Sequence, residues 1–267
     1  MKRLPSKFSA NLSLLFREVP FLERFERAAQ AGFDAVEFWW PRDESVDSVE
    51  TAIRDAGVEV ALFNLDAGDM AAGDRGLLSD PQRQAEFTDN LPVALEFARH
   101  IGCRQLNALL GLELAGLSRE DQLELAVSNL RWAAREAAKA GVAILIEAVN
   151  SFENGPYLAT HTSDALDLLE RVGEPNVALQ YDVYHMQRME GNLTATIRRH
   201  HERIAHVQIA DCPGRGEPGT GEINFPYLFD VLANVNYSGY VGLEYVPTTA
   251  DTEQSLGWLR SPAALAR

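Results

Sequence analysis

Four side chains with oxygen donors follow short apolar stretches in the second half of the sequence: Glu147, Asp182, Gln208 and Glu244. Three carboxylates brought together would repel one another and lose hydration unless a cation held them. Three carboxylate oxygens and one amide oxygen form a hard ligand set, which favours Mg²⁺ or Mn²⁺ over Zn²⁺ or copper. If the fold brings these residues together, they predict a site for one divalent metal ion.

The elements that must position these residues are short β-rich runs that alternate with longer helical patterns along the whole chain. Apolar residues recur at helical spacing in segments between the runs, including 20–31, 46–56, 84–101, 118–140 and 163–172. The predicted strands are Phe8–Ser13, Ala35–Trp39, Val58–Leu65, Gln105–Leu110, Ala143–Val149, Val177–Val183, Ala205–Ile209 and Tyr240–Tyr245.

Strand and helix repeated eight times predict an α/β fold, a single (β/α)₈ TIM barrel that covers residues 1–267 as one domain. An open doubly wound sheet is the alternative, because periodicity does not reveal closure. It is disfavoured because no strand is followed by a G-x-G-x-x-G turn.

Four glycines help to fix where helices end and strands begin. Gly32, Gly57, Gly102 and Gly141 each stand between a helical pattern and a strand pattern, as a glycine after a helix C-terminus does. This phase places the four candidate ligands at the carboxyl ends of strands five to eight, where barrel enzymes carry their active sites. Each alone could be a solvated acid or amide, but four at equivalent positions favour a metal site.

Two further residues are expected to bind substrate. His185 follows Asp182 by three residues and can face the same metal. The local sequence is equally compatible with a buried histidine that has only a structural role. Arg215, in a loop rich in glycine and proline, could bind a substrate carboxylate. If Arg215 points elsewhere, Arg75 is the next candidate.

Other residues at or near strand exits give weaker signals, because each could be a turn or cap residue. They are Asn11, Glu37, Asn64, Asn107 and Glu153. The pair Trp39-Trp40 is interpreted as core or subunit contact.

Charge and composition limit the partners. The formal net charge of −15 disfavours nucleic acid and anionic membranes, so we expect a small-molecule substrate. Neither a dinucleotide motif nor a phosphate-binding loop motif occurs, so no nucleotide cofactor is predicted. The stretch Met1–Asn11 lacks the apolar run of a signal peptide, which predicts a cytoplasmic protein. Cys103 and Cys212 are expected to be free thiols.

The longest distinctive stretches are Tyr181–Gly191, His206–Asp211 and Arg215–Asn224. With Phe8–Ser13 and Gly32–Phe38, they make the chain resemble the hydroxypyruvate isomerase family of the xylose-isomerase-like superfamily over nearly its full length.

The resemblance implies a metal site at Glu147, Asp182, Gln208 and Glu244, with glutamine where the wider superfamily has histidine. It also implies that Glu147 and Glu244 exchange a proton with the substrate, and that His185 and Arg215 contact it. The 2-oxo-tetronate isomerases share this pattern and are the main rival. Val246 departs from both groups, in which lysine is usual.

The expected reaction is the interconversion of hydroxypyruvate and tartronate semialdehyde through an enediolate, with two carboxylates as base and acid. A metal-dependent endonuclease on the same fold would need a basic face, which the acidic composition does not supply. A barrel that binds sugar acids without catalysis is a third possibility. A homo-oligomer is compatible with the sequence.

Overall fold

A computed structural model describes residues 7–260. Residues 1–6 and 261–267 lie outside the described part. The prediction that Met1–Asn11 is not a signal peptide therefore falls partly on residues that the structure does not describe. Within the described part, no helix combines the length and the apolar character that crossing a membrane requires.

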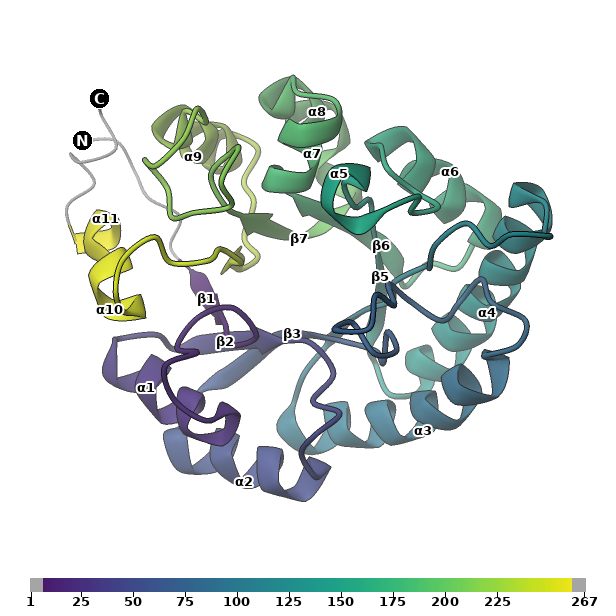
Figure 1. Cartoon of the computed structure of the whole chain (residues 1–267), viewed down its shortest axis with the longest axis horizontal. Coiled ribbons are helices and arrows are strands. Elements are labelled where there is room, and N and C mark those ends of the chain that lie inside the picture. Colours follow the sequence, from purple (N-terminus) through teal and green to yellow (C-terminus); the bar gives the residue numbers. More distant parts are fainter. Residues whose placement is uncertain (1–6, 261–267) are drawn as a thin grey trace.

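All eight predicted strands are present and form one closed parallel barrel in the order β1 to β8, with β8 pairing back to β1. Closure confirms the (β/α)₈ prediction and shows that the open-sheet alternative is wrong. Figure 1 shows the helices arranged around the ring of strands. The strands are β1 (Phe8–Asn11), β2 (Ala35–Phe38), β3 (Glu59–Asn64), β4 (Gln105–Asn107), β5 (Ala143–Glu147), β6 (Val177–Asp182), β7 (Ile204–Ile209) and β8 (Val241–Leu243).

The five predicted helical segments agree with observed helices to within a few residues. Ser45 and Ser118 cap the N-termini of α2 and α4 by accepting a backbone N–H, which explains where these helices begin. The helical elements are η1 (Phe21–Glu23), α1 (Arg24–Gln30), α2 (Val46–Ala56), α3 (Gln84–Ile101), α4 (Arg119–Lys139), α5 (Ser151–Asn154), α6 (Thr162–Val172), α7 (Val183–Met189), α8 (Leu193–His200), η2 (His201–Arg203), α9 (Phe225–Asn234), α10 (Thr252–Ser255) and α11 (Gly257–Arg260).

The four glycines that fixed the predicted phase adopt the conformation expected of them. Gly32, Gly57, Gly102 and Gly141 all have positive φ, at 96°, 68°, 71° and 67°. Side chains with a Cβ rarely adopt this conformation, so glycine ends each helix and turns the chain towards the next strand.

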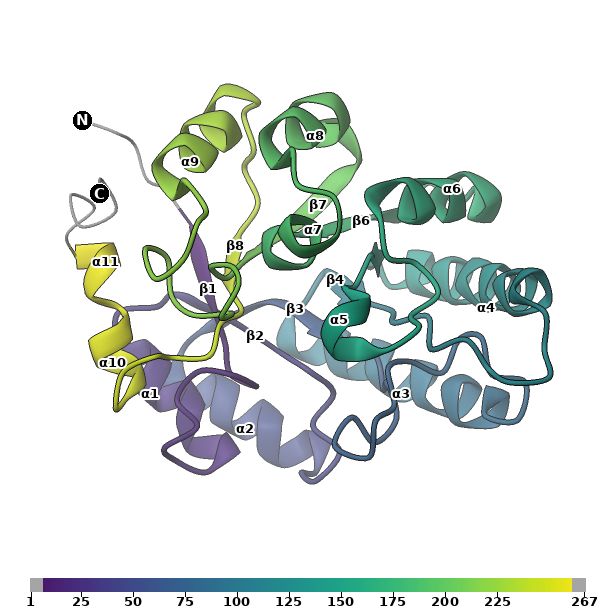
Figure 2. The same ribbon diagram turned by 45° about the horizontal axis from the view of Figure 1, so that its top comes forward.

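The predicted strands were too long mainly at their carboxyl ends. β4 stops at Asn107 instead of Leu110, because Leu110 leaves the barrel and pairs with Gly76 in the long loop after β3. β8 stops at Leu243, so Glu244 lies just beyond the strand. The chain after these two strands therefore runs in loops rather than in the barrel wall, and Figure 2 shows the ribbon from a tilted view.

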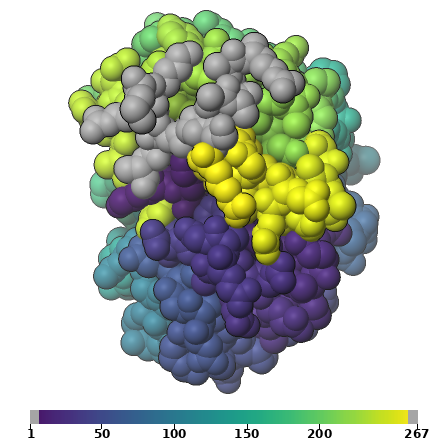
Figure 3. Space-filling view, turned by 90° about the vertical axis from the view of Figure 1, so that its left-hand side faces the viewer, coloured from purple at the N-terminus to yellow at the C-terminus, as the bar shows by residue number. Residues whose placement is uncertain are grey.

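The two ends of the described chain hold each other. Figure 3 shows the yellow C-terminal segment packed over the purple N-terminal segment. The Thr252 hydroxyl accepts a hydrogen bond from the Phe16 backbone N–H at 2.6 Å, and Arg27 forms an ion pair with Glu253 at 2.7 Å. These contacts hold the segment after β8 against the first βα unit, and so help to close the barrel.

Candidate active site at the barrel mouth

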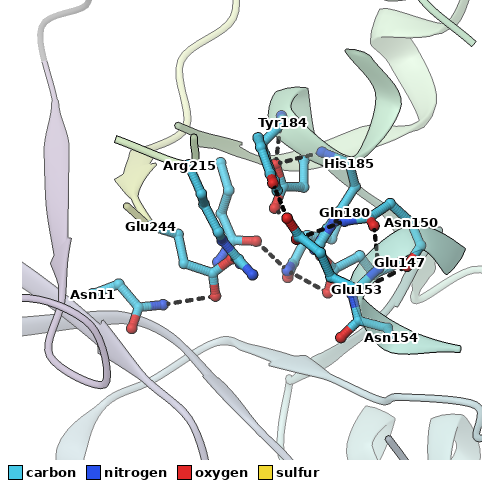
Figure 4. A network of polar contacts seen from close by, with 12 residues as sticks. Asn11, Glu147, Asn150, Glu153, Asn154, Gln180, Tyr184, His185, Arg215 and Glu244 are labelled. Carbon is cyan, nitrogen blue, oxygen red and sulfur yellow. Dashed lines mark hydrogen bonds and ion pairs between the residues drawn. The ribbon is translucent and has the colours of Figure 1, made fainter. Parts of the chain in front are cut away.

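The carboxyl ends of β5, β6 and β8 bring three buried acids together. Glu147 and Asp182 are the last residues of their strands, and Glu244 follows β8 directly. One ligand atom each from Glu147, Asp182, His185 and Glu244 lies within 4.8 Å of the others. We call these four residues the mouth cluster; Figure 4 shows their neighbourhood.

The mouth cluster carries more negative charge than its surroundings balance. Burial, and then repulsion from Glu244 and Asp182, raises the pKa of Glu147 well above its ordinary value. Burial also raises the pKa of Asp182 and of Glu244. Arg215 is the cation that faces all three acids: burial would lower its pKa, but Glu244, Asp182 and Glu147 outweigh burial and raise it. One guanidinium cannot balance three carboxylates, so the site has an excess of negative charge when all three are ionised.

Asp182 is oriented by the helix that it caps. Its Oδ1 accepts the backbone N–H groups of Tyr184 at 2.7 Å and His185 at 3.3 Å. Its Oδ2 is buried, has no hydrogen-bond partner in the described chain, and lies 3.4 Å from His185 Nε2. A buried carboxylate oxygen without a donor is costly, and a bound cation would satisfy it.

Gln208 lies next to the mouth cluster and is connected to it through Gln180, a residue that the sequence analysis did not identify. Gln180 Nε2 donates to Gln208 Oε1 at 2.6 Å and to Glu147 Oε2 at 3.0 Å. Gln208 Nε2 donates to Glu37 Oε1 at 2.7 Å, which fixes the amide so that its oxygen faces the cluster side. Because an amide oxygen has two lone pairs, it can accept this hydrogen bond and still bind a metal.

Glu37 belongs to a second buried set inside the barrel, which we call the inner network: Ser9, Glu37, His206 and Gln208. Glu37 Oε2 accepts from Ser9 Oγ at 2.6 Å and contacts His206 Nε2 at 2.9 Å. Gly242 on β8 leaves room for this carboxylate, since a Cβ there would lie 2.3 Å from Glu37 Oε2. Burial alone would raise the pKa of Glu37, but His206 and the hydrogen bonds lower it.

The orientation of His185 makes it a hydrogen-bond donor towards the cavity. Asn150 Oδ1 accepts the backbone N–H of Glu153, so Asn150 Nδ2 faces His185 Nδ1, at 2.7 Å. Since Nδ1 then accepts, the neutral ring carries its proton on Nε2, the atom that faces Asp182 and Glu147. Burial, and then Arg215, lowers the pKa of His185 to about 3, so the ring is neutral at pH 7.

Glu244 is held at both oxygens. Oε1 accepts from Asn11 Nδ2 at 3.1 Å and from Trp39 Nε1 at 3.0 Å, while Oε2 pairs with Arg215 Nη2 at 2.6 Å. Trp39 is therefore not simply a core residue, because it is half-buried and its indole N–H reaches the site from the end of β2, which only β1 separates from β8. Trp40, in contrast, packs against the buried Phe63 and Phe97.

Most of the residues that gave weaker signals at the strand exits also lie around the site. Asn107 Nδ2 donates to Glu147 Oε2 at 2.7 Å, and Asn64 lines the cavity above the cluster. Glu153 accepts a hydrogen bond from Tyr184 and so supports the helix that carries His185.

The cavity measures about 310 Å³, enough for a substrate of a few carbons, and its lining includes Glu147, His185, Arg215 and Glu244.

The donor set fits a divalent cation. It offers three carboxylates, one of which has a buried oxygen without a donor (Asp182 Oδ2), and the amide oxygen of Gln208 beside them. A parallel barrel with such a cluster at the carboxyl ends of its strands defines a TIM-barrel enzyme with a candidate metal site.

Comparison with known proteins identifies the family. The family model for xylose isomerase-like TIM barrels matches residues 25–261. The chain is 47% identical to hydroxypyruvate isomerase of Escherichia coli over 95% of this chain and 98% of that protein. It is 39% identical to 2-oxo-tetronate isomerase of Haemophilus influenzae over 95% of this chain and 98% of the relative.

Among solved structures, one described as a family 2 AP endonuclease from Brucella melitensis superposes with a TM-score of 0.91. It is 44% identical, over 96% of this chain and 98% of that one. The chain belongs to the hydroxypyruvate isomerase family, within the xylose isomerase-like TIM barrels, and is an isomerase of that family.

Proposed function

We propose that this protein interconverts hydroxypyruvate and tartronate semialdehyde at the mouth cluster, with a bound Mg²⁺ or Mn²⁺. The observation that carries the proposal is the convergence of Glu147 and Glu244 from β5 and from the end of β8 on one buried cavity. Similarity to the Escherichia coli hydroxypyruvate isomerase over nearly both full lengths supports this substrate.

In the proposed site, Glu147, Asp182, Gln208 and Glu244 hold the metal ion. When bound, the ion would stabilise negative charge that develops on the two substrate oxygens during isomerisation. The proton moves from C3 of hydroxypyruvate to C2, so one carboxylate removes it and the other returns it. Glu147 and Glu244 suit these roles because they approach the cavity from strands that are not neighbours in the barrel.

His185 and Arg215 are proposed to contact the substrate. The Nε2–H of a neutral His185 can donate to a substrate oxygen as charge develops on it, without itself competing for the proton that is transferred. Arg215 pairs with Glu244 at 2.6 Å and lies over the Tyr184 ring at 5.3 Å. It therefore holds the Glu244 carboxylate in place beside the reacting carbons of the substrate.

The test is proton exchange in D₂O followed by NMR, with hydroxypyruvate, 2-oxo-tetronates and a few free ketoses as substrates. Deuterium incorporation and product formation from hydroxypyruvate, lost with a chelator and restored by Mg²⁺ or Mn²⁺, are the expected result. Faster turnover of a 2-oxo-tetronate would assign the second activity, which the 39% identity to the Haemophilus influenzae 2-oxo-tetronate isomerase makes the serious rival. Metal-independent binding without exchange would indicate a barrel that only binds sugar acids.

The description of the Brucella structure raises a nuclease activity as a further alternative. The net charge of −15 opposes it, because a DNA backbone would be repelled at long range. Incubation with a duplex that contains an abasic site, in the same metal buffers, should leave the duplex intact.

A further inference from the structure

The cavity over the mouth cluster has a second cation in its lining, Arg75, which lies in the loop between β3 and α3. The two arginines of the cavity differ in how their charge is used. Arg215 pairs with Glu244 and faces two further acids. Arg75 instead donates to neutral oxygens, and forms no ion pair within residues 7–260.

The hydrogen bonds of Arg75 leave one amino group available. Nη1 donates to the backbone carbonyls of Met70 at 3.0 Å and Asp74 at 2.6 Å, and Nε donates to Asn154 Oδ1 at 2.7 Å. No hydrogen bond of Nη2 occurs in the described chain. Three bonds to neutral acceptors fix the plane of the guanidinium while leaving its positive charge uncompensated.

The loop that carries Arg75 has a well-determined shape. Asp74 Oδ2 accepts from the Asp69 N–H at 2.7 Å and pairs with Arg83 at 2.5 Å. Gly76 follows with φ 124° and donates its N–H to Ala67 O at 2.9 Å. A Cβ at Gly76 would lie 2.2 Å from the Leu109 carbonyl oxygen, so the loop is packed tightly against the exit of β4. Arg75 is therefore held in place rather than carried on a free surface loop.

Asn154 connects this arginine to the catalytic side of the site. It is the last residue of α5, which follows β5 and Glu147, and its Nδ2 donates to the Asn150 carbonyl at 3.1 Å. Figure 4 draws Asn154 on the same edge of the cluster as Glu147 and Glu153. Arg75, Asn154 and Glu147 line one cavity of about 310 Å³, together with apolar side chains that include Leu109 and Val149.

We infer that Arg75, oriented by Asn154, binds the carboxylate of the substrate through Nη2 and selects acids over neutral sugars. The inference rests on the proposed function, because it takes the substrate to be a short hydroxy-carbonyl acid. Arg215 then contacts the substrate at its reacting end, beside Glu244. An ion pair walled partly by apolar side chains is screened less than one in open water, so Arg75 contributes strongly to binding.

The test compares Arg75→Met with wild type in hydroxypyruvate turnover and in calorimetric binding of D-glycerate, a non-isomerising acid of the same length. We expect KM and the glycerate Kd to rise about 10- to 100-fold, the range for a lost charge-assisted hydrogen bond. The kcat and the Mn²⁺ Kd should stay within about threefold, and Arg75→Lys should recover part of the loss. Arg215→Met should instead lower kcat.

Arg42→Met is the matched control. Arg42 is also a cation near the barrel mouth, but it pairs with Asp66 at 3.0 Å and lines a neighbouring cavity, so its loss should change neither KM nor glycerate binding.

If Arg75→Met unfolds the loop, Asn154→Asp provides the test of the inference. That variant keeps the acceptor for Arg75 Nε but adds a competing charge, and should raise KM and the glycerate Kd.

Unchanged KM and glycerate binding in Arg75→Met, or in Asn154→Asp where Arg75→Met does not fold, would overturn the inference while leaving the isomerase proposal standing. If wild type fails to turn over hydroxypyruvate but binds glycerate in an Arg75-dependent manner, the proposed reaction is wrong and the carboxylate site stands. The two failures are therefore distinguishable.

Discussion

Glu37 and Glu147 are both buried inside this barrel, but their surroundings shift their pKa values in opposite directions. Glu37 in the inner network is fully buried but receives hydrogen bonds from Ser9, Gln208 and His206, and its pKa is lowered. Glu147 in the mouth cluster is buried to a similar extent, but faces Glu244 and Asp182, and its pKa is raised.

We interpret this difference as separating a carboxylate that stabilises the fold from carboxylates proposed to act in function. Glu37 has its compensation built into the fold, so it stabilises the native state through its own contacts. The mouth cluster is left with excess negative charge, which destabilises the protein alone but creates affinity for a cation.

Glu244→Gln should have the largest effect. Glutamine keeps an oxygen that Asn11 and Trp39 can bond, but has no basic carboxylate for proton transfer. We expect kcat to fall about 10²-fold or more, while Mn²⁺ binding, measured by electron paramagnetic resonance, largely persists. Full rescue of turnover by excess metal would show that Glu244 is a ligand only, and the two-glutamate mechanism would be abandoned.

Asp182→Asn should act through the metal ion. Asparagine is as good a helix N-cap as aspartate, so α7 should keep its start, but an NH₂ group or a neutral oxygen replaces the charged Oδ2 in the cluster. We expect Mn²⁺ affinity to fall about 10-fold or more. Excess metal should restore a good part of the rate, in contrast to Glu244→Gln. An unchanged Mn²⁺ Kd would remove Asp182 from the ligand set.

Glu37→Gln should reduce stability. The new amide would bring an N–H towards the side chains that now donate to Glu37, leaving buried donors of His206 or Gln208 without an acceptor. We expect a loss of about 1–3 kcal/mol in the free energy of unfolding of the metal-free protein, measured by urea denaturation. A variant as stable as wild type would mean that the inner network does not stabilise this fold.

Glu147→Gln should change stability in the opposite direction. It removes one of three mutually repelling charges, and the amide oxygen can still accept from Asn107 and Gln180. We expect the metal-free protein to become more stable by about 1 kcal/mol. With saturating Mg²⁺ or Mn²⁺ the order should reverse, because wild type gains more from binding. Destabilisation of the metal-free variant would contradict the charge imbalance described here.

The barrel and the strand ends that carry the acids could be predicted from local patterns in the chain. Alternating strand and helix patterns predicted all eight strands, and glycines such as Gly57 and Gly102 fixed their phase through a conformation that is local to the chain. Because all parallel strands end at the same face, Glu147 and Asp182 could be placed there without knowing any of their contacts.

The hydrogen-bond partners that complete the site could not be predicted from local patterns, because they depend on how the barrel closes. Asn11 and Trp39 bond to Glu244 across 233 and 205 residues, a pairing that exists only once β8 closes against β1. The roles of Gln180 and Arg75 likewise depend on which side chain lies opposite, and on how a long loop packs against the exit of β4. The local sequence pattern indicates which segments are strands or helices and in which direction they run. Hydrogen-bond partners, in contrast, depend on how the barrel closes and on the register of its strands.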